Sequence, residues 1–261
     1  CNAAYLMAKW QMDVAFAGVV GDDTYGRAIE ESLKKVGIDL TYFEKQPGKR
    51  TTSSYIIANT TIGSRTVLTS RDDDLKYSNP TILFQPDVIL VDGEELTPSQ
   101  DVLLRNPHVI SVLDAGRVRE STLKLGSLVT YFICSKDFAE AYTNQVIDTD
   151  RIDTLSSIYE KLKKDFKTNI IITLEDKGCF TKLETYEIIP SISVKAVDST
   201  GAGDIFHGAF AYFIGHHYSL RQSLQLANIT GAISVTRMGS QNSVPTLDEV
   251  LQKGKEHGIL L

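Results

Sequence analysis

The chain has 261 residues, of which 42% are hydrophobic and 23% are charged, and its formal net charge is −6. This composition is typical of a soluble globular protein and excludes a disordered, collagen-like or fibrous chain. Because acidic residues outnumber basic ones and no basic stretch stands out, we expect no nucleic-acid partner. No apolar run reaches the roughly 18 residues of a membrane helix, so we expect no membrane partner.

The three cysteines are scattered and form no CxxC pair. This pattern predicts neither a disulfide framework nor a zinc cage, and it favours a reducing cytoplasm as the compartment. The chain starts with Cys1 rather than Met, and residues 1–9 resemble the interior of a helix without a capping residue in front. We therefore expect that the chain begins inside a longer protein.

Next in chain order come a strand, a helix and a strand pair. The apolar, β-branched residues 14–20 predict a strand buried on both faces of a parallel sheet. Asp23 or Thr24 is expected to cap a helix over residues 25–36. Residues 53–58 and 65–69 flank the turn-prone segment 59–63 and alternate only weakly, which predicts a small, partly exposed pair of strands.

From residue 87 onward, strand-length apolar runs alternate with helical segments. We expect strands over residues 88–91, 109–113, 131–134 and 170–174, and helices over residues 154–166, 203–215, 220–236 and 247–257. This alternation predicts an α/β fold with a central, mainly parallel sheet that is flanked by helices on both faces.

The segment 198–208 carries the clearest chemical signal. It follows residues 192–197, which are also expected to form a strand, and it opens a helix. The small residues Gly201, Ala202 and Gly203 would leave their amides unobstructed at the positive end of the helix dipole, which makes an anion site. Asp204 stands beside them as a candidate base. The alternative is a tight helix start whose first turn merely favours a carboxylate.

Other motifs fit this segment less well. No Gly-Lys-Ser or Gly-Lys-Thr follows, so the segment is not a Walker P-loop, and its glycines have the wrong spacing for a dinucleotide fingerprint. Asn228 stands where that fingerprint would need an acid. His207 with Asp204 could suggest a metal site or a nucleophilic pair, but a structural histidine is the favoured interpretation.

Residues 198–204 together with Gly208 resemble the C-terminal signature of the ribokinase/PfkB-type carbohydrate kinases. Residues 2–4 and 14–26 are similar to the N-terminal signature of that family, and further segments follow in family order: 114–119, 173–178 and 228–245. The resemblance spans nearly the whole chain. It implies a single ribokinase-like kinase domain over residues 1–261, with a small β lid at about residues 50–70.

The resemblance also implies an activity and its cofactors. An ATP-dependent enzyme would transfer the γ-phosphate to a hydroxyl of a small sugar, with Asp204 as the base and the amides of residues 201–203 as the anion hole. Mg²⁺ would accompany ATP. Nucleotide contacts are implied at Ser135, Thr173, Asp176, Gly178 and Asn228. Substrate contacts are implied at Asn2, Arg119 and Asp204. A monovalent cation, K⁺, is implied, mainly through carbonyls, at Asp198, Thr200, Ser234, Arg237, Gly239 and Ser243. For residues 234–243, a plain loop at a helix end is the alternative.

Some residues depart from the family pattern. Ser135 and Phe138 replace the Asn and Glu of the usual Asn-x-x-Glu motif, so the contacts to Mg²⁺ stay unassigned. The segment 135–137 is similar to a Ser-Lys-Asp segment of active ketohexokinase-like members. Glu175 stands where a Gly is usual. The family's first strand with its substrate-binding Asp, its lid hairpin and its Gly-Gly pair are expected upstream of Cys1.

The acceptor is the least determined part of this hypothesis. Residues 55–57 and 63–68 resemble ketohexokinase-like members and favour a ketose or a related free sugar over ribose. A phosphosugar or a nucleoside stays open, since basic residues accompany the expected lid: Lys49, Arg50, Arg65 and Arg71. A relative that binds nucleotides without catalysis is the alternative from another functional class. The family resemblance also implies a homodimer formed through the lid strands.

Overall fold

The structure is a computed structural model, and it describes residues 1–58, 65–78, 81–83 and 85–260. The chain divides into two compact units. The smaller unit comprises Cys1 and residues 13–80, and the larger unit comprises residues 2–12 and 81–261. We describe each unit separately, and the single kinase domain over residues 1–261 stays a prediction.

The larger unit is built on a six-stranded sheet with the strand order β10-β9-β8-β7-β6-β5. Its strands are β5 (Val88–Val91), β6 (Ile110–Ala115), β7 (Tyr131–Ser135), β8 (Asn169–Thr173), β9 (Cys179–Lys182) and β10 (Tyr186–Ile189). β5 to β8 are parallel, whereas β9 and β10 are each antiparallel to the preceding strand. The predicted mainly parallel central sheet is therefore confirmed.

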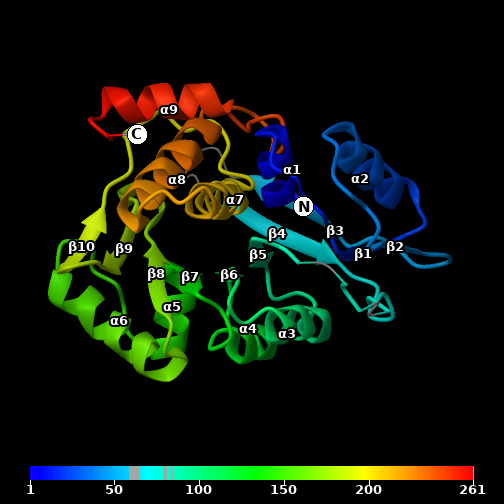
Figure 1. The fold of residues 1–261 in the computed structure, drawn as a ribbon, viewed down its shortest axis with the longest axis horizontal. Coiled ribbons are helices and arrows are strands. Elements are labelled where there is room, and N and C mark those ends of the chain that lie inside the picture. Colours follow the sequence, from blue (N-terminus) through cyan, green and yellow to red (C-terminus); the bar gives the residue numbers. More distant parts are fainter. Residues whose placement is uncertain (59–64, 79–80, 84, 261) are drawn as a thin grey trace. The chain divides into compact units, whose positions relative to one another are not determined.

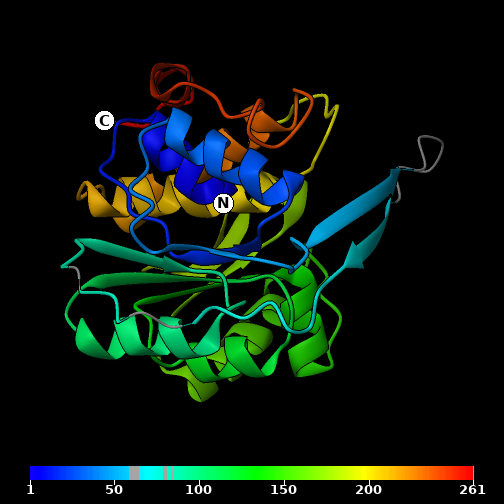
Figure 2. The ribbon, with the colours of Figure 1, turned by 90° about the vertical axis from the view of Figure 1, so that its right-hand side faces the viewer.

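Helices cover both faces of this sheet (Figures 1 and 2). On one face lie α3 (Leu96–Arg105), α4 (Glu120–Leu125), α5 (Lys136–Thr143) and α6 (Ile152–Phe166). On the other face lie α7 (Ala202–Gly215) and α8 (Leu220–Ser234), with α1 (Asn2–Lys9) against α7 and α9 (Leu247–Glu256) against α8. A short 3₁₀ turn, η1 (Glu175–Lys177), joins β8 to β9. The predicted α/β architecture is confirmed in this unit.

Burial on both faces explains why the central strands are continuous apolar runs. In β7, Phe132 and Cys134 face the core beneath α5 and α6, where Phe132 stacks on Phe166 with ring centroids 4.4 Å apart. Ile133 points to the opposite face because successive side chains of a strand alternate, and it is equally buried. Each residue of the run therefore packs against a helix.

α7 is the most buried helix of the larger unit, and all its residues from Ile205 to Ile214 are buried. Phe206, Phe210 and Phe213 are among them. The residue that follows α1 is also held in place, since the Trp10 indole N–H donates to the carbonyl of Pro245 at 3.0 Å. The Trp10 ring also packs edge-on against Tyr212, with centroids 5.0 Å apart.

The smaller unit contains one helix and two strand pairs among its described residues. α2 (Thr24–Lys35) follows the cap Asp23, as predicted. β1 (Gly18–Gly21) pairs in parallel with β2 (Phe43–Gln46), and β3 (Ser53–Ala58) pairs antiparallel with β4 (Arg65–Ser70). The predicted turn at residues 59–63 lies outside the described residues.

Two expectations for the smaller unit have different outcomes. The strand predicted over residues 14–20 is wrong in extent, because residues 14–17 form only an isolated bridge between Ala15 and Asp39 before β1 begins. The predicted strand pair is confirmed, and its partial exposure is visible in large apolar side chains such as Tyr55, Ile57 and Leu68. β3 and β4 form a two-stranded sheet of their own, and the role of this pair as a lid stays a prediction.

Among the residues that the structure describes, no helix is both long enough and apolar enough to cross a membrane.

We predict that Asp23 contributes a pH-dependent part of the stability. Its carboxylate accepts the amide of Gly26 at 2.8 Å and the hydroxyl of Thr51 at 2.7 Å. These hydrogen bonds lower the pKa of Asp23 to about 2. A depressed folded-state pKa gives stability that is present above the unfolded pKa of about 4 and is lost as the pH falls toward the folded pKa.

Asp23→Ala should therefore lower the free energy of unfolding by about 1 kcal/mol at neutral pH, and the difference from the wild type should shrink between about pH 4 and pH 2. Urea unfolding followed by circular dichroism at several pH values measures this. Asp22→Ala is the matched control, because the side chain of Asp22 forms an exposed ion pair with Arg27 at 3.0 Å and does not cap the helix. A difference for Asp23→Ala that stays constant across the range would contradict the assignment.

Candidate functional site

The approach to α7 differs from the prediction. Residues 192–197 pair with no strand in the described part of the chain, so the strand expected there is wrong. Val197 is 58% exposed, and the amides of Val197 and Asp198 both donate to the carbonyl of Val235, at 2.7 and 3.1 Å. The segment therefore runs from the sheet to α7 as a loop. Its apolar residues Val194 and Val197 are exposed, whereas those of the central strands are buried beneath helices.

The first residues of α7 leave backbone donors open. Gly201, the N-cap, has φ +77°, and a Cβ there would approach Cβ of Ser240 to 2.9 Å, so only glycine fits. No side chain caps the helix, and the amides of Gly201 and Gly203 donate to no oxygen of the described residues. The Ala202 amide donates to the carbonyl of Ser199 at 3.3 Å. Two of the three predicted anion-hole amides are thus open, and the third has a long hydrogen bond within the turn.

Asp204 is held in place by α1. The Asn2 side-chain amide donates to Oδ2 of Asp204 at 2.6 Å, which leaves Oδ1 available to another donor. α1 can lie this close because Gly208 faces it, and a Cβ at Gly208 would come within 2.8 Å of the Ala3 carbonyl oxygen. The structure therefore brings together Asn2 and Asp204, two residues for which a substrate role was predicted.

Asp198 joins two loops beside α7. Its Oδ1 accepts the Thr200 amide and its Oδ2 accepts the Gly239 amide, each at 2.9 Å. Three of the predicted cation-site residues thus lie together in one hydrogen-bonded unit. The other three have protein partners of their own: Ser234 and Ser243 donate to the carbonyls of Gly231 and Ser240, and Arg237 pairs with Glu249. Cation binding at these positions stays a prediction.

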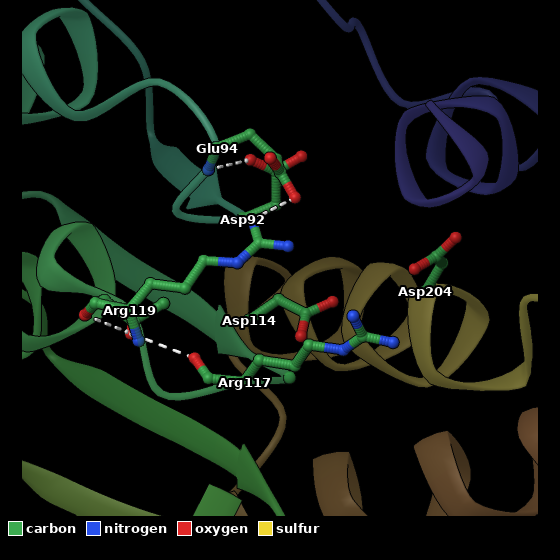
Figure 3. Close-up of a pocket in the computed structure, with 8 residues that line it drawn as sticks. Asp92, Glu94, Asp114, Arg117, Arg119 and Asp204 are labelled. Carbon is green, nitrogen blue, oxygen red and sulfur yellow. Dashed lines mark hydrogen bonds and ion pairs between the residues drawn. The ribbon is translucent and has the colours of Figure 1, made fainter. Parts of the chain in front are cut away.

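A pocket of about 280 Å³ opens between the carboxyl ends of β5 and β6 and the first turn of α7. Its charged lining is shown in Figure 3 and comprises Asp92, Glu94, Asp114, Arg117, Arg119 and Asp204. The size is near the lower end of small-molecule pockets, which begin at about 300 Å³. The carboxyl edge of a parallel sheet is also where such folds bind ligands.

The two arginines of the pocket differ in their partners. Arg119 lines the pocket as predicted, but its guanidinium forms a short ion pair with Glu94. The guanidinium of Arg117 makes no hydrogen bond or ion pair with the described residues, and Figure 3 shows it extending past Asp114. Among the described residues that line the pocket, Arg117 is therefore the cation without a bonded acid, and no sequence motif indicated a site role for it.

Asp114 is a partly enclosed acid of the pocket, with 22% of its side chain exposed. Oδ2 lies 3.4 Å from Nδ1 of the buried His207. Burial raises the pKa of Asp114, and the nearby imidazole opposes that shift. Asp92, Glu94 and Asp114 were also missed as site residues. The sequence feature that could have identified them is the position of each acid just after the carboxyl end of a predicted parallel strand, where such folds bind ligands.

Four of the five predicted nucleotide-binding residues follow the same sheet edge. Ser135 and Thr173 are paired at the ends of β7 and β8, and Asp176 and Gly178 lie in the turn after β8. The Ser135 hydroxyl accepts the amide of Phe138 and donates to the carbonyl of Gly116, both at 3.0 Å. Their contacts to a nucleotide stay predictions.

Asn228 lies apart from the other four. Its side chain on α8 is buried, and its amide donates to the carbonyl of Ile189, at the end of β10, at 2.9 Å. The structure thus gives Asn228 a partner within the protein, and a nucleotide contact from it stays a prediction.

Comparisons with known proteins agree with this geometry. Residues 1–247 match the model of the pfkB family carbohydrate kinase. The chain is 30% identical to a ribokinase of Lactococcus lactis over 258 residues, which cover 94% of this chain and 80% of that protein. It is 27% identical over 266 residues to a deoxyribokinase of Salmonella typhi, covering 95% of this chain and 84% of the relative.

A solved structure of a putative ribokinase from Agrobacterium tumefaciens is similar with a TM-score of 0.83 at 27% identity, and the match covers 98% of this chain and 85% of that one. The ribokinase-like fold that the sequence resemblance implied is therefore confirmed.

We predict that the close approach of α1 to α7 depends on Gly208. Gly208→Ala places a Cβ 2.8 Å from the backbone oxygen of Ala3, which α1 can relieve only by moving away. We expect the free energy of unfolding to fall by about 1–3 kcal/mol, measured by chemical denaturation.

Gly231→Ala is the matched control for Gly208→Ala. It also places alanine in a helix, but its Cβ meets nothing closer than 3.9 Å. It should leave stability unchanged or raise it by up to about 1 kcal/mol. Equal effects of the two substitutions would show that α1 does not rest on Gly208.

Proposed function

The chain belongs to the pfkB family of carbohydrate kinases, and from this premise we propose that the entrance of α7 carries out the transfer of the γ-phosphate of ATP to a sugar hydroxyl. Members of this family are phosphotransferases with an alcohol acceptor, and the chain is an ATP-dependent sugar kinase of this kind. The observation that carries the proposal is the juxtaposition of Asp204 with open backbone amides at one uncapped helix start.

Asp204 acts as the general base in this proposal. Oδ2 is occupied by the Asn2 amide, so the acceptor hydroxyl donates its proton to Oδ1. The oxygen of that hydroxyl forms a bond to the γ-phosphorus while the bond to the β–γ bridging oxygen breaks, and ADP leaves with that electron pair. Asn2 fixes the orientation of the carboxylate and also lies within reach of the sugar.

The amides of Gly201 and Gly203 stabilise the charge on the phosphoryl group in transit. They sit at the positive end of the α7 dipole, where negative charge is favoured. Their geometry is fixed before the reaction, so no reorganisation is needed as the charge develops. Ala202 is the weakest donor of the three, because its amide already bonds to Ser199.

ATP lies along the sheet edge in this proposal, near Ser135, Thr173, Asp176 and Gly178. In the described residues, no group of three or more His, Cys, Asp or Glu side chains could hold a metal. Phe138, which stands where the family motif has Glu, is buried in the core. In this proposal Mg²⁺ enters with ATP, whose phosphates would supply ligands to it.

The acceptor is proposed to be a small free sugar. The relatives named above are a ribokinase and a deoxyribokinase, which makes ribose and deoxyribose the first sugars to test. The ketose favoured by the lid segments, a phosphosugar and a nucleoside are the other candidates. Arg119 lies at the pocket, but its pairing with Glu94 makes it a positioning element in this proposal.

Three further expectations complete the proposal. K⁺ would bind to carbonyls of the two loops that Asp198 joins, and it would fix the loop before Gly201. A homodimer would form through β3 and β4, whose large apolar side chains are exposed. All three cysteines are unpaired, which supports a reducing compartment such as the cytoplasm.

We predict that Asp204→Asn lowers kcat for the sugar by about 10²- to 10⁴-fold, the usual contribution of a positioned base. The affinity for ATP should stay within about threefold, because Asp204 acts on the acceptor. Initial rates and nucleotide titrations measure the two effects.

Asp153→Asn is the matched control, since Asp153 is also a first-turn acid but opens α6 and pairs with Arg151 at the surface. It should have normal activity. Near-normal turnover of Asp204→Asn would remove Asp204 from its proposed role.

A further inference from the structure

The carboxylate of Asp114 lines the pocket. It accepts no hydrogen bond from the residues that the structure describes, although only 22% of its side chain is exposed. Nδ1 of His207 lies 3.4 Å from Oδ2, which is an ion-pair distance rather than a hydrogen bond. An enclosed carboxylate in this state needs donors from a ligand or from water.

His207 fixes the position of that carboxylate. The ring is 4% exposed, and Nδ1 lies 2.7 Å from the carbonyl oxygen of Gly203. Because a carbonyl only accepts, Nδ1 must carry the proton, and the same N–H edge faces Asp114. The other nitrogen, Nε2, lies 3.5 Å from the carbonyl of Ile133. The imidazole is thus held between α7 and β7, with its positive edge toward Asp114.

The charge balance of the pocket is negative. Four acids and two arginines line it, and Glu94 compensates Arg119 within one ion pair. Three carboxylates then remain against the single guanidinium of Arg117: Asp92, Asp114 and Asp204. Figure 3 shows Asp114 below Asp92 and to the left of Asp204.

The chemistry of these groups favours one class of acceptor. Ionised carboxylates only accept hydrogen bonds, and sugar hydroxyls donate them, so a polyhydroxylated neutral molecule satisfies the pocket. A phosphorylated sugar brings acceptor-only oxygens and about two negative charges into the same space, and like charges repel there.

We propose that Asp114, positioned by His207, makes this kinase select a neutral sugar over a phosphorylated one by accepting a hydrogen bond from an acceptor hydroxyl other than the one that is phosphorylated. This inference rests on the proposed function, because it concerns the acceptor of the same reaction. Asp114 would touch the substrate, whereas His207 would act only through Asp114.

The test compares acceptors in initial-rate assays of ADP release at about pH 8. Ribose, deoxyribose and fructose are first compared with wild-type protein. The neutral sugar with the highest kcat/KM is then compared with its monophosphates at each end, so that at least one of them keeps the reacting hydroxyl free. We expect wild type to prefer the neutral sugar by about 100-fold or more.

Asp114→Asn removes one negative charge and keeps the shape of the side chain. It should lower kcat/KM for the neutral sugar about tenfold, mostly through KM, and raise kcat/KM for the phosphorylated sugar about tenfold. Asp101→Asn is the matched control, because it makes the same change of charge on α3, where Asp101 pairs with Arg105 outside the pocket. It should leave the preference unchanged.

An unchanged preference in Asp114→Asn, or a wild type that prefers a phosphorylated sugar, would overturn this inference while the sugar-kinase function stands. Absence of phosphorylation of every acceptor by the wild type would overturn the proposed function and this inference with it.

The role of His207 has its own readout. His207→Leu should raise the KM for the neutral sugar about tenfold and leave the KM for ATP unchanged, because the donor edge beside Asp114 is lost. His207→Asn keeps an N–H group near the position of Nδ1 and should restore most of the sugar affinity. Lower stability in both variants with an unchanged sugar KM would show that His207 does not position Asp114. Should the Leu variant fail to fold, the Asp114→Asn comparison still decides the inference.

Discussion

The site depends on one uncapped helix start. Gly201 adopts a left-handed conformation that only glycine accepts in so crowded a place, and this turn leaves amide donors of α7 open beside the carboxylate of Asp204. Open donors at the positive end of a helix attract an anion. In the function that we propose, Asp204 in the same first turn acts as the base, which brings proton transfer and phosphate binding into one place. Hydrogen bonds around the turn keep it in position. Asn2 of α1 donates to Asp204, and the Gly239 amide donates to Asp198 in the preceding loop.

The parallel sheet supplies the rest of the site by its topology. Strands β5 to β8 end at one edge, so the residues at those ends become neighbours although they are far apart in the sequence. Asp92 and Asp114 face α7 at one part of this edge, while Ser135 and Thr173 lie farther along it. The acceptor and the nucleotide can therefore approach the same helix start from two directions. The selectivity that we assign to Asp114 follows from this arrangement.

Much of the larger unit could be predicted from sequence, because burial of β7 and β8 on both faces leaves unbroken apolar runs. The strand expected over residues 192–197 fails because strand pairing depends on a neighbour that local sequence does not reveal. The uncapped helix start at Gly201 to Gly203 was predictable since these small residues are consecutive. Asp114 and Arg117 were missed because their place in the pocket depends on strand order, and the pairing of Arg119 with Glu94 is equally non-local.

The most direct test of the central claim is a crystal structure of the protein with its sugar, ADP, Mg²⁺ and a fluorometallate that mimics the phosphoryl group in transit. We predict that the fluorometallate lies within hydrogen-bond distance of the amides of Gly201 and Gly203. Oδ1 of Asp204 should lie within the same distance of the acceptor hydroxyl. A fluorometallate bound away from α7, or an Asp204 carboxylate turned away from the sugar, would contradict the account.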